Sequence, residues 1–464
     1  MSSAGLNRRN NRRFRAEAVG APDTGAPTDG CCMRTILPSP GAQGPGPMEV
    51  HGQAVIGLPG FREWRRSGFK MLPNLKKLRA KPLSPIAGCL AVLLMLIAYA
   101  SPLRSGPDTD SHQSIDSGSI RITLLSRNGG RLSWSRASHR LIVFDRIRSG
   151  VWDLWMMDEW GKNQKCITCD RKALKWIDLQ GKPVQPPRES IGQPAWHPDG
   201  EHIIIQVSSP DHRYACLAEH PGAGQCNELW LLAPGLQTAW QLTNVDEGNP
   251  EQGTLHPHFS FDGNKLCWTE MYEQARKSPL HQYAGSWRIH WADFDIRDQT
   301  GRPSLRNRKE HQPGIATVYE CHGFNRQANA LIFSSPFDER GGPERRDIFL
   351  MALDAPHSVT RLTRSSFNEH ALFSPSEGRI VWMSKRENEG ADWWEMLPDG
   401  SGKKQITRFN QKGSPEYRAF ADGPHVTTDL SWASDGKSFV GTMQIPWRFG
   451  KGNPEVIVRI DFLE

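Results

Sequence analysis

The chain has 464 residues, 37% of them apolar and 23% charged, and a formal net charge of +7. The first 85 residues carry this charge, with 14 basic and 5 acidic side chains, whereas the remainder holds 43 basic and 45 acidic ones. A near-neutral body lacks the field that collects polyphosphates, so the composition argues against a nucleic-acid-binding protein.

Residues 1–85 predict a disordered basic tail. They contain Gly/Pro-rich stretches such as residues 41–47 and show no sustained apolar period. Such a segment cannot bury enough surface to offset the entropy of ordering. A start at Met71 would remove most of this tail and bring the next segment close to the N-terminus.

The long apolar run at residues 86–100 predicts a targeting segment, because it follows a basic stretch at residues 76–81. It is shorter than the roughly 20 residues of a spanning helix and suits the core of a signal peptide. Ala98-Tyr99-Ala100 fits a cleavage site. We expect either cleavage or anchoring in the inner membrane, then a linker at residues 101–118, with the body in the periplasm or another extracytoplasmic compartment.

From Ser119 onward the chain repeats one unit six times. Each unit has an aromatic residue, a polar turn, a β-branched run, a further strand and, in most copies, a closing Leu-Thr or Ile-Thr. The clearest turns end in Asp-Gly, which indicates a β-hairpin because glycine accepts the positive φ that tight turns require. The aromatic positions are Trp134, Trp196, Phe259, Phe324, Phe373 and Trp432. The third unit lacks a clear closing dipeptide and carries a long insertion, Tyr272–Ser286, which we expect to contact a partner.

The last unit ends after its third strand, Glu455–Phe462, while Ile120–Ser126 precedes the first unit and ends in Leu-Ser. We expect Ile120–Ser126 to complete the last blade and close the ring, which leaves few free strand edges. Residues 119–464 therefore predict an all-β, six-bladed β-propeller, and we expect it to be monomeric.

These units resemble the PD40, or WD40-like, repeat of the TolB family, whose pattern is P-x-W-S-P-D-G, a strand and a terminal L-T. The resemblance covers nearly all of residues 119–464. It implies a TolB-like propeller of the cell envelope that binds a protein or a saccharide. The family also includes propellers attached to peptidases and a few lyases, so the function must be argued from the site.

Polar residues recur on the strand that precedes each turn, which is the strand nearest the axis of a propeller. Three positions before the aromatic residues stand Arg131, Gln193, His256, Cys321, His370 and Asp429. The same stretches also carry His258, His322, His425, Glu320 and Glu369. We expect one mouth of the channel to bind a ligand through Arg131, Gln193, His256, His322, His370 and Asp429.

Neutral imidazoles with nearby carboxylates are ligands for divalent transition metals. The first hypothesis is a binding module without catalytic residues, because polar channel mouths are common in propellers. The alternative is a metal-dependent polysaccharide lyase, similar to oligogalacturonate lyase, with His256, His322 and His370 as metal ligands and Arg131 contacting the substrate. The chain has no HExxH, Walker or G-x-S-x-G motif, so no hydrolase nucleophile is predicted.

The cysteines predict two local disulfides if the body is exported. One would join Cys166 to Cys169, and the other would join Cys216 to Cys226 across a loop of about ten residues. Cys267 lies in a predicted strand and is expected to be buried. Cys321 is expected either in the core or on the channel wall.

Overall fold

A computed structural model of the chain describes residues 113–209, 221–245, 252–274, 285–337, 345–364, 366–385, 390–420, 423–444 and 455–463. The predicted tail, the apolar run and residues 101–112 of the predicted linker lie outside these ranges. Across the described ranges, no helix combines the length and apolar character needed to span a membrane. Their helices are three short 3-10 turns: η1 (Arg171–Ala173), η2 (Pro221–Ala223) and η3 (Pro234–Leu236).

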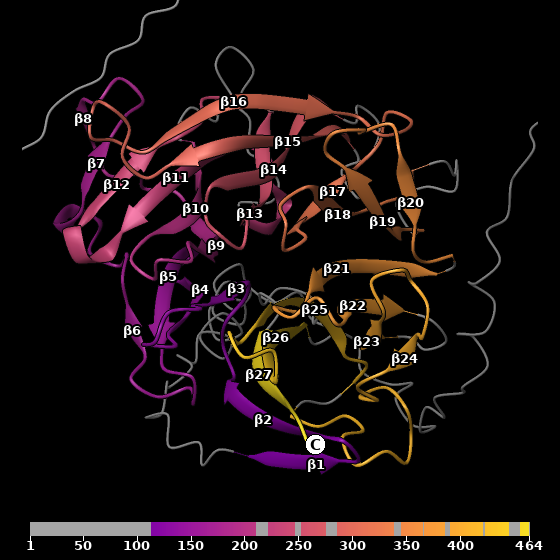
Figure 1. Cartoon of the computed structure of the whole chain (residues 1–464). Helices are drawn as coiled ribbons and strands as arrows, with labels where there is room; N and C mark the ends of the chain where they lie inside the picture. Colours follow the sequence, from indigo (N-terminus) through magenta and orange to yellow (C-terminus); the bar gives the residue numbers. More distant parts are fainter. Residues whose placement is uncertain are drawn as a thin grey trace, which may run out of the picture. The chain divides into compact units, whose positions relative to one another are not determined.

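Six sheets surround a common axis, so the described chain is an all-β, six-bladed propeller as the repeats predict (Figure 1). Blade 1 contains β3 (Leu132–Trp134), β4 (Ile142–Arg148), β5 (Val151–Met157) and β6 (Lys165–Cys166). Blade 2 contains β9 (Ile191–Trp196), β10 (Ile203–Ser208), β11 (Asn227–Ala233) and β12 (Thr238–Gln241), with β7 (Lys175–Ile177) and β8 (Pro183–Val184) added at its outer edge.

The third and fourth blades have four strands each. Blade 3 contains β13 (Gly253–Phe259), β14 (Lys265–Gln274), β15 (Gly285–Asp295) and β16 (Ser304–His311). Blade 4 contains β17 (Glu320–Phe324), β18 (Ala330–Ser335), β19 (Asp347–Ala352) and β20 (Val359–Arg361). The third blade thus forms a fourth strand without a closing dipeptide. The ends of its predicted insertion extend β14 and β15, and residues 275–284 lie outside the described ranges.

The last two blades complete the ring. Blade 5 contains β21 (Phe367–Phe373), β22 (Ile380–Lys385), β23 (Asp392–Met396) and β24 (Lys404–Gln405). Blade 6 contains β25 (Val426–Trp432), β26 (Ser438–Gln444), β27 (Glu455–Phe462), β2 (Ile120–Ser126) and β1 (Ser114–Ser117). The strands nearest the axis are β3, β9, β13, β17, β21 and β25, one from each blade (Figure 1).

The Leu-Thr and Ile-Thr dipeptides lie just after the fourth strand of four blades. Each threonine hydroxyl donates a hydrogen bond to a carboxylate on the third strand. It also accepts one from the backbone N–H of the residue that follows this carboxylate, and all these bonds measure 2.5–3.1 Å. The Thr and carboxylate pairs are Thr168 with Asp153, Thr243 with Glu228, Thr363 with Asp347, and Thr407 with Asp392. The dipeptide therefore anchors the outer strand to its blade through a fully bonded, buried carboxylate.

The repeated aromatic residues pack between blades. All six are at most 8% exposed, with Trp134 the most buried at 2%. Their clusters mix residues from neighbouring sheets, as where Val143 of blade 1 packs with Trp196 and Ile203 of blade 2. Large aromatic side chains fill the wedge between twisted sheets, which explains why the repeat requires them.

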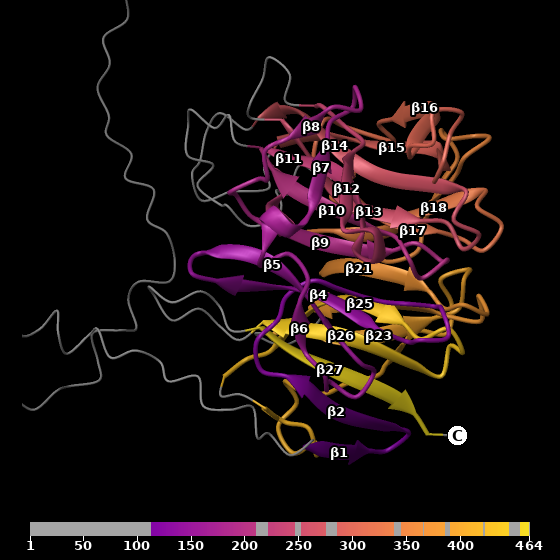
Figure 2. The same ribbon diagram turned by 90° about the vertical axis from the view of Figure 1, so that its left-hand side faces the viewer.

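The ring closes as predicted, because β2 pairs antiparallel with β27 at the other end of the sequence (Figure 2). The register places Ile122 opposite Ile460 and Ile120 opposite Phe462. Ile122 is fully buried in a core cluster that also contains Val458 and Trp432.

Three of the predicted cysteine states can be assessed. Cys166 and Cys169 form the predicted disulfide. Cys226 is also disulfide-bonded, while Cys216, its predicted partner, lies outside the described residues. Cys267 and Cys321 are free thiols, both fully buried, with their sulfur atoms 3.0 Å apart. Cys321 is thus a core residue, and the channel-wall alternative is wrong.

Replacing Ile122 with alanine should lower the free energy of unfolding by about 2–5 kcal/mol. The substitution leaves a cavity beside the closing strand, and the packed blades around it cannot move in to fill the space. Arg121→Ala on the same strand is the matched control, since its half-exposed side chain makes only a surface ion pair with Asp116. That control should leave stability nearly unchanged, because exposed ion pairs contribute little. Urea unfolding followed by tryptophan fluorescence measures both. Equal effects of the two substitutions would contradict this account of ring closure.

Candidate functional site

β-Bulges aim side chains from the innermost strands into the channel. In β9, β13, β21 and β25 two residues oppose one residue of the second strand. They stand three and two positions before the aromatic residue in the first three strands, and four and three positions before it in β25. Gln193, His256 and His370 occupy the first bulge position with φ of 49°, 52° and 52°. Side chains other than glycine rarely adopt this left-handed conformation, and it tends to occur at functional sites. A bulge also redirects its side chain out of the normal alternation.

The bulge of blade 4 has a different backbone, and this corrects one sequence prediction. The counting rule places Cys321 in the polar ring. In β17 the irregularity instead falls between Cys321 and Gly323, with φ of 117° at the glycine. Cys321 therefore turns into the core against Cys267, and His322 turns towards the channel residues.

A cavity of about 670 Å³ occupies this end of the channel. Five of the six predicted ligand-binding residues line it: Arg131, Gln193, His256, His370 and Asp429. The sixth, His322, lies against two of them with its ring buried to 2% exposure. The structure thus brings the predicted set together at one mouth.

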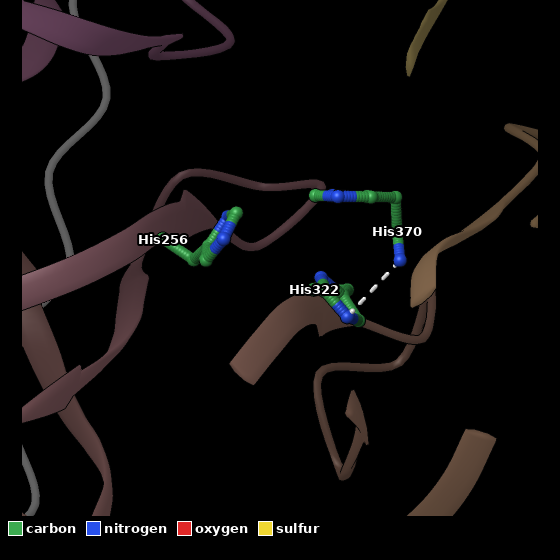
Figure 3. Close-up of side chains that lie close together, drawn as sticks. All are labelled: His256, His322 and His370. Atoms are coloured by element: carbon green, nitrogen blue, oxygen red, sulfur yellow. Dashed lines mark hydrogen bonds between the residues drawn. The ribbon is translucent and has the colours of Figure 1, made fainter. Parts of the chain in front are cut away.

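His256, His322 and His370 form a nearly equilateral triangle. Their ring centroids are separated by 5.5 Å, 5.5 Å and 5.6 Å. One potential ligand atom from each ring can be chosen so that all three lie within 4.8 Å of one another. Figure 3 shows the three side chains projecting from separate strands, with the backbone N–H of His370 donating to Nε2 of His322 at 3.3 Å. The Ser334 hydroxyl lies 2.9 Å from the same nitrogen.

Histidine 425 does not join this group. Its Nδ1 and Nε2 lie 2.9 Å and 2.7 Å from the carbonyl oxygens of Gly423 and Ala419. Its ring stacks on Phe409. It is a satisfied structural histidine. His258 faces the opposite end of the channel, where it lines a second, smaller cavity.

Carboxylates surround the histidine triangle. Asp429 Oδ1 lies 3.3 Å from His370 Nδ1 and 4.0 Å from His256 Nδ1. Glu320 lies 3.7 Å from His256, and Glu369 lies 3.7 Å from His370. The Arg346 guanidinium bridges Glu320 and Glu369, so these two carboxylates are held in place and partly neutralised.

These charges act differently on the three imidazoles. Burial lowers the pKa of His256, although Glu320 and Asp429 oppose this shift. Burial and the neighbouring histidines hold the pKa of His322 well below its usual range. Burial also disfavours a charged His370, but the Asp429 carboxylate outweighs it and raises the pKa of His370. Burial therefore favours the neutral form of His256 and His322, whereas Asp429 favours the charged form of His370.

Sequence reasoning missed residues that reach the cavity from second and third strands. Asp145 on β4 accepts a hydrogen bond at 2.8 Å from Nε of the buried Arg131, which was itself predicted. Glu455 begins β27 and accepts a hydrogen bond from Gln444 Nε2 at 3.0 Å. Arg346 and Lys385 also line the cavity. These residues lie outside the innermost strands, and the one usable signal for them was a charged residue at the edge of an apolar strand.

Glu455 is a carboxyl group that changes protonation near neutral pH. Burial and the neighbouring Asp145 raise its pKa from 4.5 to about 7, against the opposing effect of Arg131. Between these values the folded state holds a proton that the unfolded chain has lost. The Glu455 contribution to stability therefore falls as the pH rises from 4.5 to about 7 and remains low above it.

Glu455→Gln removes this titration while keeping the shape of the side chain. Above pH 7 the variant should be more stable than the parent protein by roughly 2–4 kcal/mol. This difference should shrink towards zero as the pH falls to 4.5, the pKa of the carboxyl group in the unfolded chain. Urea midpoints across this pH range measure the effect, with the exposed Glu201→Gln as control. Parallel pH profiles for Glu455→Gln and the parent protein would contradict the assignment.

No family model matches the chain, and no curated protein matches it. Similar solved structures include TolB from Acinetobacter baumannii, 17% identical over 83% of this chain and 72% of that one, with a TM-score of 0.39. Oligogalacturonate lyase from Vibrio parahaemolyticus is 10% identical over 76% and 96%, with a TM-score of 0.42. An oligogalacturonate lyase in complex with manganese is 11% identical over 75% and 81%, with a TM-score of 0.41. Such similarities carry no function from one protein to another.

The sheet order and the channel residues define the class of this protein: a six-bladed β-propeller with three histidines gathered at one mouth of its axial channel. The TolB structures are among the solved structures to which this chain is similar.

Proposed function

We propose that the protein is a cell-envelope propeller that binds an anionic saccharide in its channel through a divalent transition metal held by His256, His322 and His370. The observation that carries this proposal is the histidine triangle, whose ligand atoms lie within 4.8 Å of one another. Two of the imidazoles are kept neutral, which is the state that binds a metal.

The geometry fits a metal site that tightens on loading. Metal–nitrogen bonds of about 2.1 Å place neighbouring ligand nitrogens about 3–3.5 Å apart. The present separations therefore need only a small inward rotation of the rings. Asp429, beside His370, can orient that ring as a metal-bound histidine requires, and His322 would offer Nδ1 to the metal once its Nε2 donates to Ser334 instead of accepting from the His370 N–H. Three protein ligands leave further positions for an oxygen ligand.

The remaining cavity suits a small anionic ligand better than a protein domain. Its volume of about 670 Å³ lies within the usual range for small-molecule sites. Arg131 and Arg346 on its wall are paired with carboxylates, so the metal and the exposed Lys385 at the edge of the cavity would supply the positive charge for an anion. Among the described residues, the buried Oε1 atom of Gln193 has no hydrogen-bond donor. Buried acceptors are normally bonded, so a ligand hydroxyl is a fitting partner.

The disulfides support an envelope location. Cys166–Cys169 is formed, and Cys226 is also disulfide-bonded. Disulfides persist mainly in oxidising compartments, such as the periplasm or the cell exterior. Export through the predicted segment at residues 86–100 is part of this proposal.

A metal-dependent polysaccharide lyase is the second candidate, and Glu455 is the observation that favours it. This carboxyl group lines the same cavity, and burial raises its pKa to about 7. A proton acceptor with a pKa near the working pH is well suited to general-base catalysis. In this version, Glu455 would remove a proton from a sugar that Arg131 and the metal hold.

His322→Ala or His370→Ala should abolish tight metal binding, with the affinity for Mn²⁺ or Zn²⁺ falling at least about 100-fold, since loss of even a supporting residue costs 10–100-fold. His357→Ala is the control, because that histidine is exposed in the loop between β19 and β20, the two outer strands of blade 4. Elemental analysis and titration calorimetry measure the loss. Parent protein that takes up neither metal, and whose melting temperature is unchanged by a chelator, would overturn the proposal.

Lys385→Gln should weaken binding of an oligomer of uronic acids about fivefold, the effect of losing one exposed ion pair worth up to ~1 kcal/mol. The methyl-esterified oligomer, which has no charge, should bind weakly, with the same affinity for the parent protein and for Lys385→Gln. Lys412→Gln is an exposed control of the same charge. Unsaturated sugar products during the assay would select the lyase, and their absence with binding retained would select the binding module. Equal affinity for charged and esterified oligomers would contradict anion recognition.

A further inference from the structure

The disulfide between Cys166 and Cys169 lies at the outer end of blade 1, four strands away from the channel axis (Figure 1). Cys166 ends β6, which is the outermost strand of its sheet. Both cysteines are only half-buried, and the exposed Lys165 and Asp170 stand on either side of them in the sequence. A thiol group from solution can therefore reach the disulfide.

The blade does not need this disulfide to hold its outer strand. The Ile-Thr dipeptide of blade 1 stands between the two cysteines, and Thr168 bonds to the Asp153 carboxylate and to the N–H of Leu154. Blades 2, 4 and 5 have the same threonine anchor between other residues: Gln241 and Asn244, Arg361 and Arg364, and Gln405 and Arg408. A disulfide that closes so short a loop also constrains the unfolded chain less than one that closes a long loop. The cysteine pair is thus an addition to the repeat.

The backbone beside the disulfide favours a negative charge on the sulfur of Cys166. The N–H of Cys169 donates to Sγ of Cys166 at 3.0 Å. Hydrogen bonds to an ionised acceptor are stronger than those to a neutral one, so this bond strengthens when the disulfide opens and Cys166 becomes a thiolate. The Cys-x-x-Cys spacing is itself a setting that favours the thiolate form.

Positive charge also lies beside the pair. Nη2 of Arg148 lies 3.4 Å from the carbonyl oxygen of Cys169, and its Nε lies 3.6 Å from Asp153 Oδ2. Arg171 bonds to the other oxygen of Asp153 at 3.0 Å. Two guanidinium groups therefore surround one carboxylate, which leaves a net positive charge near the disulfide.

Asp153 and the two cysteines could also be read as a metal site, since one potential ligand atom from each lies within 4.8 Å of the others. Asp153 already bonds to Thr168 and Arg171, however, and the two arginines would repel a metal cation. The same positive charge stabilises a thiolate. The surroundings of the pair therefore favour thiol–disulfide exchange over metal binding.

We propose that Cys166–Cys169 is a redox-active disulfide that oxidises a pair of thiols on a partner protein. A thiolate of the partner attacks Sγ of Cys169, a mixed disulfide forms, and Cys166 leaves as the stabilised thiolate. The second thiol of the partner then loses its proton and attacks the partner's sulfur in the mixed disulfide, which releases Cys169. The partner loses two electrons and becomes a disulfide, the two cysteines gain these electrons, and the two thiol protons pass to the new thiols or to water.

The first test brings the whole protein to equilibrium in buffers of reduced and oxidised glutathione, and reads residues 166 and 169 by alkylation and peptide mass spectrometry. The pair should become reduced while the tryptophan fluorescence of the folded protein is retained, whereas structural disulfides resist reduction by glutathione. Arg148→Gln should lower the equilibrium constant for reduction about fivefold, the effect of losing one exposed charge. Arg297→Gln, an exposed arginine between β15 and β16, is the matched control and should leave the constant unchanged. A pair that stays oxidised in every buffer, or is reduced only on unfolding, would overturn the proposal.

The second test assigns the roles of the two sulfur atoms. Cys169→Ser leaves Cys166 as a single thiol that still receives the backbone N–H of residue 169, whereas Cys166→Ser leaves Cys169 without this bond. At pH 7, Cys166 in the first variant should react with iodoacetamide at least about threefold faster than Cys169 in the second, because its larger thiolate fraction outweighs its lower nucleophilicity. Equal rates would contradict Cys166 as the leaving group.

The third test measures the activity itself. The parent protein should oxidise an equimolar synthetic peptide that carries two thiols, and Cys166→Ser should not, since it has no disulfide at this position. His322→Ala should oxidise the peptide as the parent protein does, so failure of the metal proposal would leave this one intact. A parent protein that leaves the peptide reduced would overturn the proposed activity.

Discussion

The whole architecture depends on the pairing of β2 with β27, which joins the two ends of the described chain. Six blades that twist in the same sense can form a ring only if the first and last meet, and an open ring would expose two long strand edges. Antiparallel pairing through Ile122 and Ile460 removes these edges and buries apolar side chains at the same point. Because the innermost strands are held at fixed angles by this closure, side chains from six blades can share one small channel.

Within this rigid ring, irregular backbone creates the site. A regular innermost strand would alternate its side chains between neighbouring blades, where His256 and His370 would be buried without partners. The bulges, with left-handed φ at Gln193, His256 and His370, turn these side chains towards the axis. Such conformations are strained and persist because two-sided packing leaves the strands no alternative. The fold therefore supplies the stability that lets these residues adopt unfavourable conformations.

The two mouths of the channel differ in how their charges are arranged. At the histidine end, arginines and carboxylates alternate, so Arg131 faces Asp145 and Arg346 bridges Glu320 and Glu369. Positive and negative groups there hold one another in place and set the protonation of the imidazoles. At the opposite end, Arg136 lines the smaller cavity and contacts the Phe261 ring, with no acidic partner among the described residues. Ion pairs therefore fix the charged groups at the histidine end of the channel, whereas an aromatic contact holds Arg136 at the other end.

The sequence alone determined the elements that follow local rules. The repeated aromatic residues, the Asp-Gly turns and the Leu-Thr dipeptides fixed six blades, and the unpaired Ile120–Ser126 fixed how the ring closes. The local Cys166–Cys169 disulfide and five of the six ring positions also followed from spacing, because equivalent strands place equivalent residues at equivalent depth. Tertiary structure decided what depends on backbone detail or distant pairing. Gly323 allows a different bulge in β17, so His322 replaces Cys321 at the site. Arg346 and Glu455 arrive from third strands, whose contacts with the channel depend on sheet register, and no periodic pattern in the sequence records that register.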